Sequence, residues 1–196
     1  MSRKAEKTKQ MIIEKAAPVF NEKGLLGTSI DDVLEIAKVS KGCLYGHFTD
    51  REELSHAMAK HLLSKIVSLA RNSMDKETTA KGKLLAFMSM YRNPLKTPIA
   101  GGCPIFNLAV DTDDTNPAIK QQVKATMKGA IRDLTSVVRL GISQKEFSSK
   151  IDPEEFALKL FLLIEGALVA CRALESNKPM VTTLNILRRE LESYLL

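Results

Sequence analysis

Residues 28–54, TSIDDVLEIAKVSKGCLYGHFTDREEL, decide the fold of this 196-residue chain. Thr28 and Ser29 are favoured N-cap residues, and the apolar residues that follow them recur at helical spacing, which predicts a short helix. Ser40 can cap a second short helix after a tight turn. Two short helices joined in this way are typical of a helix-turn-helix, whose second helix enters the major groove of DNA.

The same stretch resembles the DNA-binding domain of the TetR family of bacterial transcriptional regulators. The family pattern reads roughly Thr-Thr-Val, a helix, Gly-Val-Ser-Lys-Gly-x-Leu-Tyr-x-His/Tyr-Phe and Lys-Glu-x-Leu. This chain matches it at residues 28–30, 39–48 and 51–54 without a gap. Leu34 replaces a common alanine, and Gly46 removes a side chain from the second helix. Lys38 replaces the usual turn glycine, so we expect it to carry a Cβ penalty in a left-handed conformation.

The resemblance also implies a set of residues that face DNA. Thr28, Lys41, Tyr45 and Arg51 are the expected phosphate contacts, and Gly42 lets the helix approach closely. Phosphate contacts carry little sequence information, so base reading is left to Ser40, Cys43, Gly46 and His47. The expected DNA-binding set, with the cap residue and the N-terminal basic residues added, is Thr28, Ser29, Ser40, Lys41, Gly42, Cys43, Tyr45, His47, Arg51, Arg3 and Lys4.

Composition, cysteine content and net charge narrow the classes of protein to which this chain can belong. The chain is 44% hydrophobic and 27% charged, which is ordinary for a soluble domain. It contains no apolar run of ~20 residues and no signal sequence, so we expect a cytoplasmic protein without a membrane partner. Its three cysteines are widely spaced and predict neither a disulfide framework nor a metal site. The net charge of +6 suits a polyanion, but residues 1–60 hold ten basic and nine acidic residues, so the excess lies elsewhere.

The remaining sequence predicts only helices. Helical patterns cover residues 3–23, 50–72, 77–92, 104–111, 117–144, 152–176 and 180–195, and no segment shows a convincing period of two. Pro18 should kink or strain the first helix, and Gly24 should close it. We therefore expect an all-α fold of about nine helices, with a three-helix DNA-binding domain at residues 1–49. A larger helical domain for effector binding and dimerisation follows at residues 50–196.

The helix expected at residues 152–176 is apolar on nearly every side, and a subunit interface would bury such a helix. We therefore expect two copies of the chain to pair through this helix and the last one. A homodimer would present its second helices to successive major grooves of a pseudo-palindromic operator. The expected interface residues are Phe156, Leu162, Leu168, Leu184, Leu187 and Leu191.

By resemblance, the second domain encloses a cavity for a small apolar or aromatic effector, although methionines and aromatic residues suit an ordinary core equally well. The expected lining is Phe87, Met88, Tyr91, Cys103, Phe106, Met127, Ile131, Phe161 and Glu165. Glu165 could orient a ligand, pair with Arg172 or contact a partner subunit, and we favour the contact with a partner subunit. Cys103 follows two glycines in an expected loop before a helix, so it is either a packed residue or a reactive sensor thiol.

Three functional readings follow. The first is a homodimeric regulator, a repressor released from its operator by a small molecule. The second is a DNA-binding regulator controlled by a protein partner or by oxidation of Cys103. The third, an enzyme, is disfavoured because no phosphate-binding loop, nucleophile elbow or metal motif is present, and His56 and His61 are spaced wrongly for a metal pair. No cofactor is expected.

Overall fold

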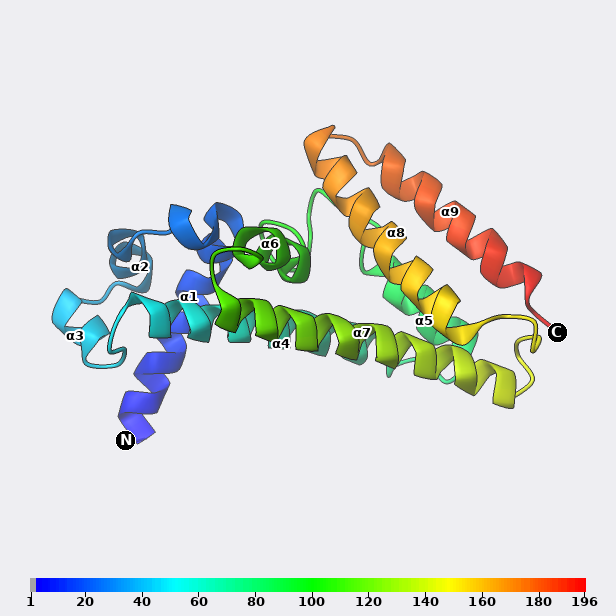
Figure 1. Ribbon diagram of the computed structural model, residues 1–196, viewed down its shortest axis with the longest axis horizontal. Coiled ribbons are helices and arrows are strands. Elements are labelled where there is room, and N and C mark those ends of the chain that lie inside the picture. The colour runs from blue at the N-terminus through cyan, green and yellow to red at the C-terminus, as the bar shows by residue number, and fades with distance from the viewer. Residues whose placement is uncertain (1–2) are drawn as a thin grey trace. The chain divides into compact units, whose positions relative to one another are not determined.

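The structure is a computed structural model that describes residues 3–196, and these residues are mostly helical (Figure 1). Within them the helices are α1 (Arg3–Gly27), α2 (Ile30–Ala37), α3 (Lys41–Tyr45), α4 (Arg51–Met74), α5 (Ala80–Ser89), α6 (Pro104–Thr112), α7 (Pro117–Ser143), α8 (Pro153–Ala173) and α9 (Lys178–Ser193). The expected all-α fold of about nine helices is confirmed. None of these helices is both long and apolar enough to cross a membrane.

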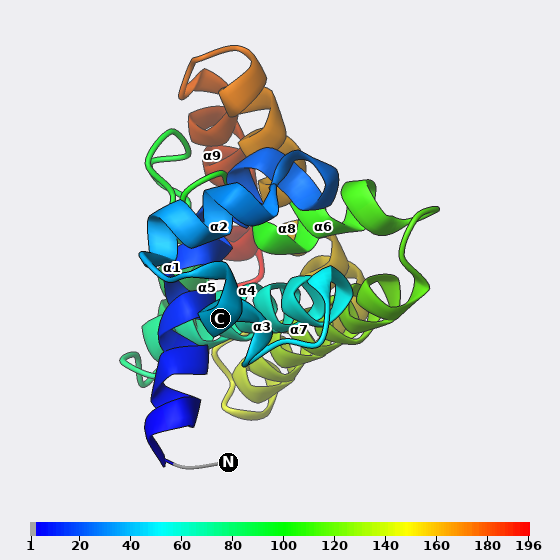
Figure 2. The ribbon, with the colours of Figure 1, turned by 90° about the vertical axis from the view of Figure 1, so that its left-hand side faces the viewer.

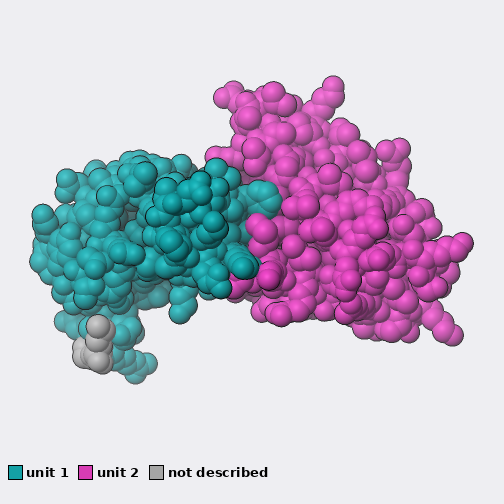
Figure 3. Space-filling model, in the orientation of Figure 1, with its two compact units in different colours: residues 1–66, 99–124 teal, residues 67–98, 125–196 magenta. Residues whose placement is uncertain are grey.

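The chain divides into two compact units, which Figure 3 colours separately. Unit 1 comprises residues 1–66 and 99–124, and it holds α1, α2, α3 and α6 with the first parts of α4 and α7. Unit 2 comprises residues 67–98 and 125–196, and it holds α5, α8, α9 and the remaining parts of α4 and α7. We predicted a boundary after residue 49, between a DNA-binding domain and a domain for effector binding and dimerisation. This division by function stays a prediction.

Helix α1 is anchored by one apolar face, on which Ile12, Ala16 and Phe20 are at most 1% exposed. Pro18 lies inside the helix, but the backbone leaves helical geometry at Gly24, where φ is 79° and ψ is 176°. The kink that we expected from the proline is therefore displaced to the glycine, which adopts a positive φ without a Cβ penalty. A short helical stretch then continues to residue 27.

In unit 2, α8 packs against α9. The predicted start of α8 is confirmed. Asp152 is the N-cap, and its Oδ1 accepts hydrogen bonds from the backbone N–H groups of Glu154 and Glu155 at 2.9 Å each. Pro153 follows in the first turn, where its missing N–H costs nothing. This cap sets where α8 begins and therefore which of its residues face the core.

Candidate DNA-binding surface

A capping box begins α2. Ser29 is the N-cap, its Oγ accepts a hydrogen bond from the Asp32 N–H at 3.0 Å, and the Asp32 carboxylate accepts one from the Ser29 N–H at 2.8 Å. Lys23 Nζ donates to the same carboxylate at 2.6 Å. This bond from Lys23, followed by those from Ser29, holds the pKa of Asp32 well below its usual range. Asp32 is therefore a charged acceptor at the positive end of the α2 dipole.

The turn between α2 and α3 contains the conformation that we predicted. Lys38 is the C-cap of α2, with φ at 56° and ψ at 49°, in the left-handed region. A residue with a Cβ pays roughly 1–2 kcal/mol there compared with the right-handed region. The chain accepts this cost where related proteins use glycine, and the tight turn is kept: the Val39 N–H donates to the Leu34 carbonyl at 3.2 Å.

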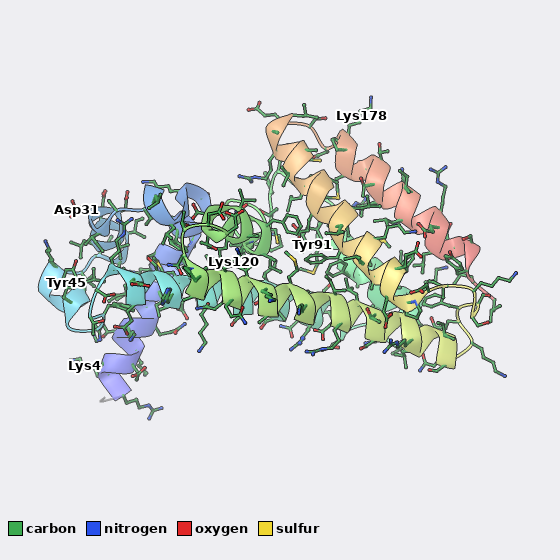
Figure 4. All side chains as sticks on the ribbon, viewed as in Figure 1. Lys4, Asp31, Tyr45, Tyr91, Lys120 and Lys178 are labelled. Atoms are coloured by element: carbon green, nitrogen blue, oxygen red, sulfur yellow. The ribbon has the colours of Figure 1, made fainter. Side chains whose placement is uncertain are left out.

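Helix α3 is only five residues long. Ser40 is its N-cap, and the Ser40 Oγ accepts a hydrogen bond from the Cys43 N–H at 3.2 Å. Leu44 is 1% exposed and anchors the helix, whereas Lys41 and Gly42 are exposed and Tyr45 is 42% exposed. Figure 2 looks onto the end of unit 1 that carries α2 and α3, and Figure 4 labels Tyr45 there. The expected outward face of α3 is thus present.

His47 does not lie on this helix, contrary to our expectation. Helix α3 ends at Tyr45, and His47 is in the following turn, half-buried, with a buried Nδ1 that has no hydrogen-bond partner. Phe48 beyond it is 1% exposed, and Lys9 Nζ lies 4.7 Å from its ring centroid. Because α3 ends at Tyr45, it carries the Tyr45 side chain but not that of His47. Any contact of His47 with DNA would come from the turn.

Two expected phosphate contacts have structural partners that the sequence did not suggest. Thr28 is only 4% exposed, and its hydroxyl donates to the Gly24 carbonyl at 2.8 Å. Its contact with phosphate stays a prediction. Arg51 Nη2 donates to the carbonyls of Leu25 at 2.9 Å and of Thr28 at 3.0 Å. Arg51 therefore supports the connection between α1 and α2, because it donates to carbonyls in the last turn of α1 and in the connection itself. Its contact with phosphate stays a prediction.

The N-terminal basic residues are helical. Arg3 and Lys4 lie in the first turn of α1, and both are exposed. Figure 4 labels Lys4 near this end of the helix. Their expected contact with a phosphate or the minor groove would therefore be made from a helix end.

Helix α6 is bound to α1 by a group of polar contacts that we name the α1–α6 clamp: Asn21, Leu25, Asn107, Asp111 and the carbonyls of residues 100–102. Asn21 is 4% exposed, and its Nδ2 donates to the carbonyls of Ala100 at 2.6 Å and Gly102 at 3.2 Å. Asn107 Nδ2 donates to both oxygens of Asn21, at 3.1 and 3.2 Å. The Leu25 N–H donates to Asp111 Oδ2 at 2.5 Å. Asparagines carry no periodic signal, so sequence reasoning missed this clamp.

The clamp changes the interpretation of Cys103. We expected a flexible loop around it, but Gly101 has a φ of 91°, and a Cβ there would lie 2.9 Å from the Asn21 carbonyl oxygen. The loop is held tightly against α1. Cys103 is the N-cap of α6 and is 4% exposed. Its burial opposes direct reaction with an oxidant.

The expected effector residues belong to both units. In unit 2, Phe87, Met88, Tyr91 and Phe161 are buried, and the Phe87 and Tyr91 rings meet edge to face at 5.6 Å. Glu165 is 1% exposed and lies inside the apolar part of α8. Met127 and Ile131 are half-buried in unit 2, while Cys103 and Phe106 belong to unit 1. Their role as an effector pocket stays a prediction.

The expected dimer set is only partly available to a partner. Phe156, Leu168, Leu187 and Leu191 are at most 2% exposed within one chain, so they are core residues and cannot form an interface. Leu162 is 46% exposed, and Leu184 is half-buried. The error arose because an all-apolar helix shows no sequence difference between its two faces.

The outer face of α8 and α9 is nevertheless apolar. Exposed side chains of this face, which the sequence reading did not single out, are Leu158, Leu163, Val169, Leu174, Val181 and Ile186. A groove of about 570 Å³ runs between the two helices, lined by Leu162, Gly166, Ala170 and Thr183 among others. Exposed apolar surface is typical of interaction sites when it forms a large patch.

Comparison with known proteins identifies the family. Residues 12–58 match the family of bacterial regulatory proteins named tetR, and residues 80–187 match the tetracyclin repressor-like C-terminal domain. The regulator TtgR of Pseudomonas putida is 24% identical over 165 residues, which are 83% of this chain and 79% of TtgR.

Two solved structures extend the comparison. A TetR-family regulator from Cytophaga hutchinsonii is 30% identical with a TM-score of 0.92, and the match covers 100% of this chain and 98% of that one. A cysteine mutant of the regulator CifR, solved with 26-bp operator DNA, is 18% identical with a TM-score of 0.76, and the match covers 94% of this chain and 95% of that one. These relatives are regulators rather than enzymes. The chain belongs to the TetR family of DNA-binding transcriptional regulators.

Proposed function

We propose that this protein is a homodimeric repressor that binds a pseudo-palindromic operator through α3 and is released from it by a small effector. The observation that carries the proposal is the outward face of α3. Lys41 and Tyr45 are exposed beside an anchored Leu44, in a helix that Ser40 caps. The CifR structure with operator DNA supports this use of the fold.

Within this surface, each residue has a proposed role. Lys41 and Tyr45 bind phosphates and set the register of α3, because their long polar side chains extend beyond the helix. Ser40 and Cys43 lie at the start of α3 and are the candidates for base edges. His47 contributes from the turn, where its ring is half-exposed.

Dimerisation is proposed through the exposed apolar face of α8 and α9. Leu158 and Leu162 lie one turn apart on α8 and are 44% and 46% exposed, and Val169 continues this face at 55%. A two-fold axis would bring the same face of a second copy onto it, which buries this surface on both chains. Both α3 helices would then be presented to one operator.

Effector control is proposed through α6. The α1–α6 clamp ties α6 to the first helix of the DNA-binding region, so a ligand that displaces α6 would also displace α1. The effect on DNA cannot exceed the preference of the ligand for one state. A 100-fold change in operator affinity requires about 2.7 kcal/mol of coupling. The burial of Cys103 favours a ligand over oxidation as the signal.

The test is selection of bound sequences from a randomised DNA pool by the full chain. We expect an inverted repeat, and we expect it to be lost with Tyr45→Ala or Lys41→Ala but kept with the exposed control Lys76→Ala. Lys41→Ala should also reduce the magnitude of the salt slope of binding by about 0.9 if its amine neutralises a phosphate. Recovery of no motif, or of one that survives Tyr45→Ala, would refute α3 as the reader.

A further inference from the structure

The basic charge of the chain lies away from the helix-turn-helix. Residues 28–54 contain three basic and six acidic residues, whereas the chain as a whole carries +6. Helix α7 contains Lys120, Lys124, Lys128, Arg132 and Arg139 against one acid, Asp133. Of the described helices, α7 therefore carries the largest net positive charge, and the operator-reading function assigns it no role.

Four of these cations form a row that winds slowly around the helix, because residues four apart also turn by about 40° about its axis. We call it the α7 basic row: Lys120, Lys124, Lys128 and Arg132. They recur every fourth residue, and all four are exposed. Each step of four residues advances about 6 Å along the helix axis, so the row is about 18 Å long. Figure 4 labels Lys120 near the start of this helix.

The protein does not neutralise this row. Among the described residues, no acidic side chain forms an ion pair with Lys124, Lys128 or Arg132. Asp133, the one acidic residue of α7, forms an ion pair with Arg71 at 2.7 Å. Like charges four residues apart destabilise a helix. The three consecutive like-charged pairs of the row therefore destabilise α7. Their presence favours a role in binding a partner rather than in the fold.

We propose that the α7 basic row binds the phosphate backbone of a second segment of duplex DNA, independently of sequence. Charge complementarity selects this partner, because a winding row of evenly spaced cations suits a polyanion whose charges are also regularly spaced. The exposed residues beside the row, Gln121, Ala125 and Ser136, are small or polar. Neither the aromatic anchors of a protein interface nor the apolar face of a membrane-binding helix is present there.

The row gives the regulator a second DNA contact. A dimer whose α3 helices occupy an operator would still expose two basic rows. It could then hold a neighbouring DNA segment, which raises the local DNA concentration or bridges two segments. Four phosphate contacts predict a salt slope of about −3.6 for this second interaction.

The test compares two triple variants that remove equal charge. One is Lys124→Gln, Lys128→Gln, Arg132→Gln; the control is Lys76→Gln, Lys96→Gln, Lys150→Gln, three exposed lysines outside α7 and outside the α8–α9 groove. Each protein is first saturated with immobilised operator, and capture of a labelled random duplex is then measured from about 50 mM salt upward. We expect capture by the wild type and the control. For the row variant, the magnitude of the salt slope should be smaller by about 2.7.

The result separates this proposal from the proposed function. Random-duplex binding is also measured with Tyr45→Ala, Lys41→Ala protein, which lacks α3 contacts, so that the row is assayed without an operator. If the triple variant folds poorly, Lys124→Gln alone tests the same row. It should lower the magnitude of the salt slope by about 0.9. Equal capture by the row variant and the control would overturn the proposal. Stronger wild-type binding to an acidic peptide or to anionic phosphatidylserine vesicles than to duplex DNA would also overturn it.

Discussion

Asn21→Ala should loosen the α1–α6 clamp and destabilise unit 1. The substitution removes two donated bonds, from Nδ2 to the Ala100 carbonyl at 2.6 Å and to the Gly102 carbonyl at 3.2 Å. It also removes Oδ1, which accepts from Asn107 at 3.2 Å. Asn107 keeps two acceptors, the carbonyls of Asn21 and Gly101, so its amide is not left without a partner.

The loss of stability depends on whether water can replace each hydrogen bond that Asn21 made. Ala100 is exposed, so water can replace the bond to its carbonyl, and the loss there is small. Gly102 is buried, so its carbonyl stays unsatisfied, which costs about 1–3 kcal/mol. With the bond from Asn107 included, we expect a total loss of roughly 2–3 kcal/mol. For a chain of this size that lowers the melting temperature by about 4–12 °C.

Two measurements check this prediction. Urea unfolding gives the free-energy loss, and hydrogen exchange reports whether amides of residues 101–107 open more often. Asn185→Ala on the exposed side of α9 is the matched control and should change stability by less than about 0.5 kcal/mol. A loss for Asn21→Ala no larger than that of the control, or unchanged exchange in residues 101–107, would show that the clamp does not hold α6.

Three further predictions concern acid stability, assembly and packing. The Lys9 amine, 2.6 Å from Glu53, is the main cause that lowers the pKa of Glu53 to about 2; its stabilisation is complete above the ordinary pKa of 4.5 and disappears as the pH falls from there toward 2. Unfolding midpoints measured from pH 6 to pH 2 should show this loss. Leu162→Glu should convert the proposed dimer into monomers in sedimentation analysis, because it puts a charge into an apolar face. Gly141→Ala should cost about 1–3 kcal/mol or more in thermal unfolding, because its Cβ would lie 2.2 Å from the buried Phe147 ring.

Each of these has a control. Glu53→Gln should be less stable than wild type at pH 6, and the difference should shrink in acid; a constant difference would refute the linkage. Leu168→Ala, in the core beneath the proposed interface, should lower stability but leave the dimer intact. An unchanged dimer for Leu162→Glu would remove that face from assembly. Gly129→Ala, where a Cβ meets nothing, should not destabilise, and equal effects at both glycines would refute the packing argument.

Local signals predicted much of the DNA-binding region. Cap residues act over three or four positions, so Ser29, Ser40 and Asp152 could be read as helix starts from their neighbours alone. The left-handed Lys38 was predictable for the same reason, since the turn geometry depends on a few consecutive dihedral angles. The row of cations on α7 also follows from the period of the helix once the helix is known.

Contacts between distant segments were not predictable. The partners of Arg51 are carbonyls about 25 residues away, and those of Asn21 lie about 80 residues away. Hydrogen bonds of this kind leave no periodic pattern, and a polar residue looks the same whether it binds solvent or a buried carbonyl. The sequence by itself therefore determined the helices, their caps and the reading motif. Only the tertiary structure decided which apolar face of α8 is core, and that Thr28 is buried, because burial depends on what packs against a residue.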